Sequence, residues 1–94
     1  MLIHVTGAKG LVGQEVVKAV ASLGEVIGTD ADDMDVCNRD EVNRTLESQP
    51  PNVMVHLAAL KGNQPSRENP FAFFQVNTVG TMNLLETCRN LGVE

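Results

Sequence analysis

The chain has 94 residues, of which 43% are hydrophobic and 20% charged, a composition typical of one soluble globular domain. Its formal net charge is −5 and its Lys and Arg residues are scattered, so it lacks the basic patch that nucleic-acid binding requires. No run approaches the ~20 apolar residues that span a bilayer, and the opening MLIHV is too short for a signal peptide. The two cysteines stand far apart without metal-ligand spacing, which favours reduced thiols in a cytoplasmic protein.

The first part of the chain alternates short apolar runs with a helical pattern. Residues 2–5 are apolar and partly β-branched, which predicts a buried strand ending at a glycine-rich turn. Apolar residues then recur every three to four positions over 11–23, which predicts a helix with Gly24 as its left-handed C-cap. Residues 25–29 form the second predicted strand, and Asp30 stands at its carboxyl end.

The second part of the chain repeats the alternation. The stretch NRDE at residues 38–41 predicts a capping box that opens a second helix. Residues 53–57 are apolar on both faces, as in a parallel strand covered by helices. The polar, proline-bearing residues 61–70 predict a loop, and residues 71–91 predict a long helix that Gly92 ends.

Three strand–helix pairs in succession predict the α/β class, with a doubly wound parallel sheet and right-handed crossovers. We expect three strands in the order 3-2-1, with helices on both faces. In that order the first strand is an open apolar edge, so we expect self-association into a homo-oligomer through this edge, or poor solubility. The next strand of such a fold would lie beside the first strand, where the strand order reverses.

The turn between the first strand and the first helix carries Gly7, Gly10 and Gly13, in the stretch TGAKGLVG. A helix that begins there directs unpaired N–H groups and its positive dipole end at a ligand, and glycines let a diphosphate approach the backbone. The spacing is G-x-x-G-x-x-G, whereas the general dinucleotide fingerprint is G-x-G-x-x-G. From the spacing alone, a purely structural turn remains the alternative.

Asp30 adds weight to the phosphate-binding interpretation. It follows the second predicted strand, close to the ~20 residues beyond the first glycine at which dinucleotide sites carry an acidic residue. A carboxylate there accepts hydrogen bonds from both ribose hydroxyls and repels a 2′-phosphate, which favours NAD over NADP. The alternative is a solvated loop acid beside Asp32 and Asp33.

Four motifs in order resemble the extended short-chain dehydrogenase/reductases, and within them the nucleotide-sugar epimerases and dehydratases. They are T-G-x-x-G-x-x-G at residues 6–13, Asp-Val at 35–36, H-x-A-A at 56–59 and N-x-x-G-T-x-x-L-L at 77–85. A lysine after the Ala-Ala pair, in AALK at 58–61, is similar to the UDP-hexose 4-epimerase branch. The motifs cover nearly the whole chain, and the resemblance implies a Rossmann-type fold.

The resemblance implies NAD as the cofactor and assigns contacts to it. The backbone of residues 7–13 would bind the diphosphate, Asp30 the adenosine ribose, and Asp35 with the Val36 amide the adenine. Small side chains after the third strand would let the cofactor approach, and Lys61 would reach its ribose or phosphates. The expected cofactor-binding residues are Gly7, Gly10, Leu11, Val12, Gly13, Asp30, Asp35, Val36, Leu57, Ala58, Ala59, Lys61 and Asn77.

Some of these residues have structural alternatives. Ala58 and Ala59 could form a close-packed strand end, and Lys61 could be a solvated loop charge. Asn77 would lie near the cofactor and hold its helix beside the third strand, but it could instead bond only to backbone. Val76 departs from the epimerases, which often have a second asparagine at this position, and this puts one family contact in question.

The family's chemistry depends on a Tyr-x-x-x-Lys pair near a Ser or Thr, and this chain contains no tyrosine. We therefore expect no catalytic residue, and we expect His4 and His56 to be hydrogen-bonded core residues, without a metal site. Residues 1–94 are expected to be an incomplete NAD-binding Rossmann segment, the N-terminal half of the fold without the substrate domain. The expected function is the NAD-binding part of a nucleotide-sugar epimerase, dehydratase or reductase; the alternative is a non-catalytic dinucleotide-sensing or scaffold module.

Overall fold

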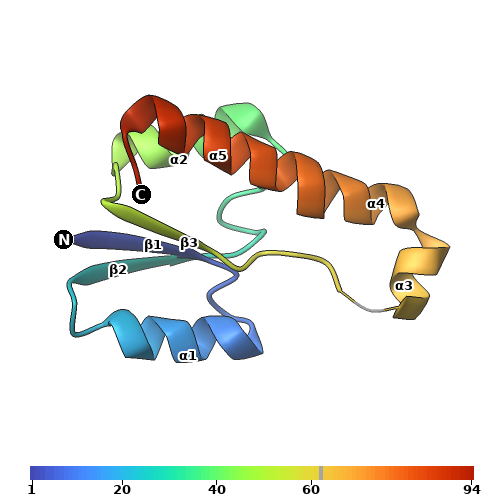
Figure 1. Cartoon of the computed structure of the whole chain (residues 1–94), viewed down its shortest axis with the longest axis horizontal. Coiled ribbons are helices and arrows are strands. Elements are labelled where there is room, and N and C mark those ends of the chain that lie inside the picture. The colour runs from blue at the N-terminus through green and yellow to red at the C-terminus, as the bar shows by residue number, and fades with distance from the viewer. Residues whose placement is uncertain (62) are drawn as a thin grey trace.

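The computed structural model describes residues 1–61 and 63–94 and shows a three-stranded sheet between two helical layers (Figure 1). The strands are β1 (Leu2–Thr6), β2 (Glu25–Thr29) and β3 (Val53–His56). The helices are α1 (Leu11–Val20), α2 (Arg39–Ser48), α3 (Asn63–Glu68), α4 (Pro70–Phe74), the π-helical turn η1 (Gln75–Val79) and α5 (Gly80–Leu91). The alternating parallel α/β plan predicted from the sequence is confirmed.

The strand order corrects the expected arrangement. The strands are parallel and lie in the order β2-β1-β3, so that Thr6 of β1 pairs with both Thr29 and His56. The expectation 3-2-1 had placed the second strand at the centre and a later strand beside β1, where β3 in fact lies. Because β1 is hydrogen-bonded on both sides, it is no open edge, and self-association through it has no structural basis. The apolar pattern identifies strands, but it does not say on which side of β1 the third strand adds.

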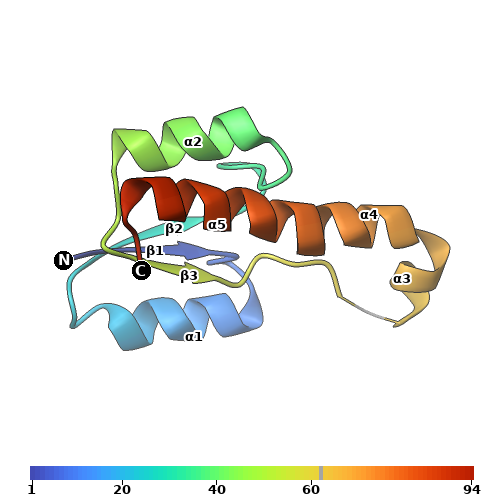
Figure 2. The same ribbon diagram turned by 45° about the horizontal axis from the view of Figure 1, so that its top comes forward.

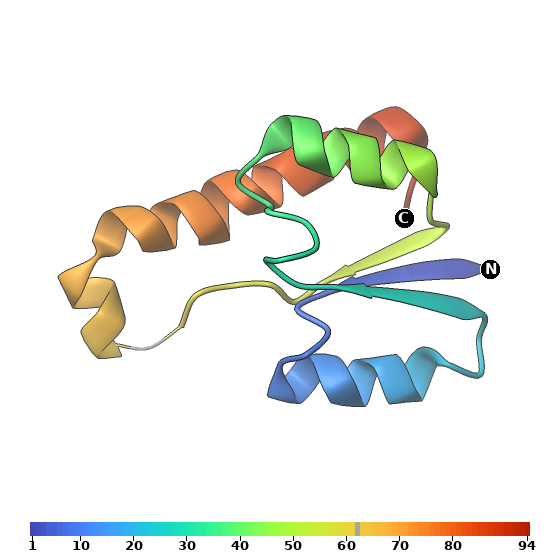
Figure 3. The same cartoon turned by 180° about the vertical axis from the view of Figure 1, so that it is seen from behind.

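The two crossovers run in opposite directions from the middle of the sheet. A right-handed connection that reverses its direction places its helix on the opposite face. Accordingly α1 covers one face, while α2 and α5 lie together on the other (Figure 2). The loop from β2 to α2 leaves the carboxyl end of β2 toward the α2 side (Figure 3). Helices on both faces therefore agree with the prediction.

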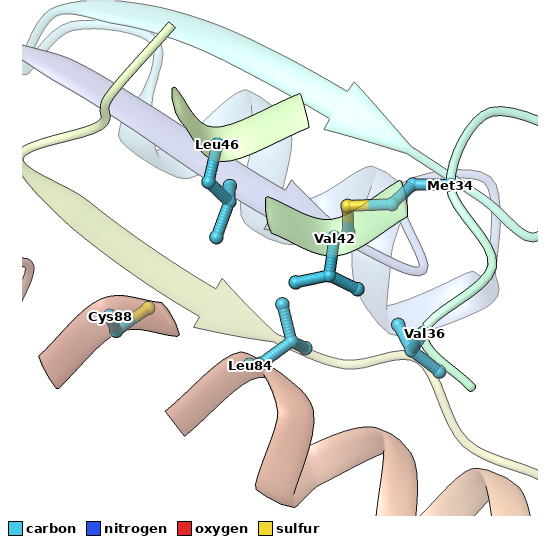
Figure 4. Packing of buried hydrophobic residues seen from close by; sticks show 6 residues of the cluster. All are labelled: Met34, Val36, Val42, Leu46, Leu84 and Cys88. Atoms are coloured by element: carbon cyan, nitrogen blue, oxygen red, sulfur yellow. The ribbon is translucent and has the colours of Figure 1, made fainter. Parts of the chain in front are cut away.

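The main apolar core lies between the sheet and the α2–α5 layer (Figure 4). Its buried members are Met34, Val36, Val42, Leu46, Leu84 and Cys88. At the start of α2, the Asn38 side chain accepts a hydrogen bond from the Glu41 amide at 3.1 Å, as the capping box predicts. The Glu41 carboxylate, however, accepts from the Asp35 amide at 3.1 Å instead of returning to Asn38. Helix α2 is thereby tied to the loop that carries Asp35.

The end of α1 differs from the prediction. The helix ends at Val20, with Ala21 as a right-handed C-cap, and Gly24 is not among the glycines with positive φ. Gly24 is required for a different reason, since a Cβ there would lie 2.1 Å from the Met1 carbonyl oxygen. The glycine permits a close backbone approach beside β1, which the periodicity of one helix cannot reveal.

The polar stretch predicted as a loop contains α3, and this prediction was wrong. Pro65 lies in the first turn of α3, where a missing N–H removes no intrahelical hydrogen bond. Gly62, which the expected loop included, lies outside the described residues. The long helix is present as α4, η1 and α5, and Gly92 ends it in the left-handed conformation with φ 69°. Strand β3 ends at His56, so Leu57 belongs to the loop that follows it.

Candidate functional site

A cavity of about 510 Å³ opens at the carboxyl ends of the strands, beside the N-terminus of α1. In a doubly wound sheet this is where ligands bind, at the point where the strand order reverses. Every expected cofactor-binding residue except Asn77 lines it: Gly7, Gly10, Leu11, Val12, Gly13, Asp30, Asp35, Val36, Leu57, Ala58, Ala59 and Lys61. The structure thus brings together residues from three of the four motifs, along with Asp30 and Lys61, and their contacts with a cofactor stay a prediction.

One wall of the cavity is the glycine turn. Gly7 has φ +69°, a conformation that only glycine adopts without strain, and its carbonyl oxygen accepts from the Gly10 amide at 3.1 Å. A Cβ on Gly13 would lie 1.9 Å from that same oxygen. Gly7 therefore sets the turn, and Gly13 lets α1 begin directly against it.

The start of α1 is open to an anion. Its N-cap is Gly10, which provides no side-chain hydrogen bond, and the first turn contains no acidic residue. Leu11 and Val12 are 81% and 62% exposed. The first amides of a helix have no intrahelical acceptor, and with the helix dipole they favour negative charge. An uncapped helix start in a glycine cradle fits a diphosphate.

The opposite wall is the loop after β3, which Thr6 holds. The Thr6 hydroxyl oxygen accepts from the Leu57 amide at 3.0 Å and from the Ala58 amide at 3.1 Å. A Cβ on Gly7 would lie 2.9 Å from both the Ala58 nitrogen and the Leu57 carbonyl carbon. The two walls therefore meet backbone to backbone, and no other residue than glycine fits between them.

The two acidic residues lie in the cavity in different states. Both carboxylate oxygens of Asp30 lie 3.3 Å from the Lys9 amide, so the side chain is directed toward the glycine turn. The Asp35 carboxylate accepts from the Cys37 amide at 2.9 Å and so closes a local turn. Asp33 has a structural role, because its carboxylate accepts from the Asp30 amide at 2.9 Å. Of these acids, Asp30 is the one whose carboxylate lies in the cavity beside the glycine turn.

The loop after Asp35 is pressed against the start of α5. Val36 is only 7% exposed and its carbonyl accepts from the Asn83 side chain at 2.8 Å. A Cβ on Gly80 would lie 2.6 Å from the Val36 side chain. This packing explains why a glycine stands in the N-x-x-G-T motif, and it fixes the part of the cavity expected to receive adenine.

Asn77 acts on the cavity indirectly. It lies in η1, and its side-chain amide forms a pair of hydrogen bonds of 2.8 Å with the Leu60 backbone, donating to the carbonyl and accepting from the amide. The amide is thus engaged, so the alternative of a backbone-bonded asparagine describes it better than a direct cofactor contact. The wide π-helical turn, a feature frequent at functional sites, also places Val76 on the cavity wall.

Several residues of the site escaped the sequence analysis. Ala31, Met34 and Leu60 line the cavity from irregular loops, where no periodic pattern marks them. Thr6 was seen only as the first letter of the glycine motif. Its hydroxyl at the end of a central strand, next to a glycine that must lie close to another loop, is the signal that could have identified it.

Both histidines are hydrogen-bonded, as predicted. His4 Nε2 lies 2.8 Å from the Thr29 hydroxyl, and His56 Nδ1 lies 2.7 Å from that of Thr6. Burial lowers the pKa of both imidazoles below their ordinary value. Within residues 1–61 and 63–94, no three His, Cys, Asp or Glu side chains come together as a metal site, and no helix is long and apolar enough to cross a membrane.

The fold and this cavity define a Rossmann-type nucleotide-binding protein. The chain belongs to the NAD dependent epimerase/dehydratase family, whose sequence model matches residues 3–94. It is 38% identical over 96 residues to a GDP-6-deoxy-D-talose 4-dehydrogenase of Aggregatibacter actinomycetemcomitans, covering 99% of this chain and 32% of that protein. It is 40% identical over 55 residues to a dTDP-glucose 4,6-dehydratase of Salmonella typhimurium, covering 58% of this chain and 15% of that protein.

Solved structures agree with this assignment. A dTDP-4-dehydrorhamnose reductase from Clostridium acetobutylicum superimposes with a TM-score of 0.95 at 33% identity, over 100% of this chain and 34% of the other. A UDP-glucose 4-epimerase from Thermus thermophilus, solved with NAD, gives a TM-score of 0.92 at 31% identity, over 100% and 35%. The resemblance to extended short-chain dehydrogenase/reductases is confirmed. The chain spans about a third of the length of these relatives.

Proposed function

We propose that this chain binds NAD through its adenosine diphosphate part, as the N-terminal cofactor-binding segment of a cytoplasmic nucleotide-sugar epimerase, dehydratase or reductase. The observation that carries the proposal is the uncapped start of α1 above a glycine cradle whose space a Cβ would fill. Membership of a family described as NAD dependent supports the choice of cofactor. NAD, when bound, supplies a hydride acceptor and donor.

The residues of this chain would bind and orient the cofactor. The amides of Leu11 and Val12 and the dipole of α1 would hold the diphosphate, with Lys61 on the opposite wall as a further positive charge. Asp30 would accept hydrogen bonds from the adenosine ribose and repel a 2′-phosphate. Because the sequence has no tyrosine, these residues supply no Tyr-based proton transfer.

The substrate of the complete protein would be a nucleotide sugar. Several relatives carry names of enzymes of GDP-, UDP- and dTDP-linked sugars, and they include a dehydrogenase, epimerases and dehydratases. Since these names span several reaction types, we propose the substrate class and no single reaction. Turnover of GDP-, UDP- and dTDP-hexoses by the full-length protein would separate an enzyme from the sensing or scaffold module.

Calorimetric titration of the chain with NAD, NADP and ADP-ribose tests the proposal. We expect NAD and ADP-ribose to bind equally, because in this proposal the cavity takes up only the adenosine diphosphate part, and NADP to bind more weakly. Asp30→Asn is the matched variant, since it keeps the shape of the side chain and removes its charge. This variant should narrow the difference in affinity between NAD and NADP. No binding of ADP-ribose by a folded chain would contradict the proposal.

A further inference from the structure

A chain of hydrogen bonds runs beneath the cavity from β1 to α5. The Thr6 hydroxyl oxygen lies 2.7 Å from His56 Nδ1, and His56 Nε2 lies 3.1 Å from the Thr81 hydroxyl oxygen. The Thr81 hydroxyl donates in turn to the Asn77 carbonyl oxygen at 2.9 Å. Three side chains from β1, β3 and α5 are thus connected across the sheet and into η1.

Counting donors and acceptors shows which atom donates in each of these hydrogen bonds. Thr81 gives its one hydroxyl proton to Asn77, so its oxygen must accept from a proton on His56 Nε2. In a neutral imidazole Nδ1 is then an acceptor, and Thr6 donates to it. The two remaining positions on the Thr6 oxygen are filled by the Leu57 and Ala58 amides. The arrangement is fully satisfied for one tautomer only.

Both ends of this chain act on the loop after β3. At one end Thr6 accepts from the Leu57 and Ala58 amides. At the other end, Thr81 donates to the Asn77 carbonyl in η1. The Asn77 side chain forms two hydrogen bonds with the Leu60 backbone. His56 is the link between the two ends, although it does not line the cavity itself.

Protonation of His56 would break this series of hydrogen bonds. A second N–H on Nδ1 would face the Thr6 oxygen, whose acceptor positions are already filled. Desolvation lowers the pKa of His56, which agrees with a neutral ring. The titratable and charged groups near it in the described part of the chain are Cys88 and Arg89 of α5 and Glu94, which share a second cavity with it, and His4 on the same face of β1.

We propose that His56, held as the neutral Nε2–H tautomer between Thr6 and Thr81, is a positioning residue that fixes the loop after β3 against the glycine turn. Cofactor affinity then depends on a neutral imidazole that is not in contact with the cofactor. The proposal rests on the proposed cofactor binding, but the tautomer and the order of the loop do not, so they can be tested separately.

The tautomer is measured by ¹⁵N NMR of the imidazole in the intact chain over pH 8 to 5. We expect the Nε2–H signature for the neutral His56 ring and protonation only below the ordinary pKa of a histidine. A ring protonated on Nδ1 in its neutral form, or one that exchanges freely between tautomers, would overturn the proposal. This result does not depend on whether NAD binds.

The loop is tested with Thr6→Val, which removes the hydroxyl at nearly constant shape, and Thr6→Ser, which restores it. Thr6→Val should speed hydrogen exchange of the Ala58 amide, which loses its acceptor, more than that of the Leu57 amide, which also donates to the Thr6 carbonyl at 3.2 Å. It should weaken ADP-ribose binding about tenfold. Thr6→Ser should stay close to wild type. Thr87→Val is the control, because it removes another buried hydroxyl, bonded to Asn43, and should leave ADP-ribose affinity unchanged.

The pH dependence separates positioning from a general loss of stability. ADP-ribose affinity of the wild type should fall as the pH is lowered through the titration of His56. In His56→Asn, which can keep the Thr6 contact and cannot be protonated, this fall should largely disappear. If Thr6→Val does not fold, the comparison of the wild type with His56→Asn still tests the positioning role of His56. Equal pH profiles for wild type and His56→Asn, or equal exchange in Thr6→Val and wild type, would overturn the proposal. Failure of the wild type to bind ADP-ribose, with tautomer and exchange as expected, would instead refute only the cofactor assignment.

Discussion

The two walls of the cavity are built by different means. The glycine turn is set by its own backbone, since Gly7 adopts a positive φ and Gly13 leaves room for the Gly7 carbonyl. The loop after β3 is held by side chains distant in sequence, with Thr6 bonded 51 residues away to Leu57 and Asn77 bonded to Leu60. One wall therefore leaves no room for a Cβ on Gly7 or Gly13, whereas the other depends on bonds that can be removed one at a time.

The largest effect should come from filling the glycine wall. In Gly13→Ala the new Cβ would lie 1.9 Å from the Gly7 carbonyl oxygen, and all the atoms it meets are backbone atoms of Gly7 and Ala8. We expect the free energy of unfolding to fall by about 3 kcal/mol or more, measured by urea denaturation. Gly92→Ala is the control, because its site has φ 69° but nothing within 4 Å, and should cost about 1–2 kcal/mol. Equal losses in the two variants would contradict the packing argument.

The next effect concerns the acid beside the glycine wall. Asp30→Ala should weaken NAD by about 1–3 kcal/mol, as for hydrogen bonds to a charged group, measured by calorimetry. Asp32→Ala is the matched control, because Asp32 is exposed in the same loop and does not line the cavity. An unchanged NAD affinity in Asp30→Ala would remove this residue from the site.

A smaller effect is expected at the other wall. Asn77→Leu removes two hydrogen bonds to the exposed Leu60 backbone, so we expect NAD to bind about 1 kcal/mol more weakly. The control Asn69→Ala removes the side-chain cap of α4, which lowers stability by about 1 kcal/mol without affecting the cavity. If the control weakens NAD binding as much as Asn77→Leu does, the effect comes from helix stability and not from the contact between Asn77 and Leu60.

The smallest effect is the dependence of stability on pH. Burial lowers the pKa of His4 and His56 below 6.5, so near this pH the unfolded chain binds protons that the folded chain does not. Their contribution to stability is therefore complete above pH 6.5 and is lost as the pH falls from 6.5 toward the lowered folded values. Urea denaturation between pH 7.5 and 5 checks the sign, and a stability that rises on acidification would contradict it.

Local patterns in the sequence were sufficient for the glycine wall and for most elements. Residues 25–29 form a strand as predicted, and the glycine spacing together with Asp30 located one side of the cavity. The order of the strands was not accessible, because a right-handed crossover is satisfied on either side of β1. The middle of the predicted polar loop was also misjudged, since the short helix α3 consists of polar residues and has no apolar period.

The second wall shows why part of a site escapes prediction. The motif H-x-A-A identified residues 57–59 as part of the site. It did not reveal that Leu57 and Ala58 are bonded to the hydroxyl of Thr6. Likewise Asn77 was expected at the cofactor, while its side chain holds Leu60. Both dependences are hydrogen bonds between segments far apart in the chain, which no local spacing records.

The most direct test of the central claim is the response of backbone amides to ADP-ribose, followed by ¹H–¹⁵N NMR of the folded chain. The account predicts the largest shifts at the amides of Gly10, Leu11 and Val12, with smaller ones at residues 57–59. It predicts weak or absent shifts when nicotinamide mononucleotide replaces ADP-ribose at the same concentration. Saturable binding that leaves the start of α1 unperturbed would contradict the account.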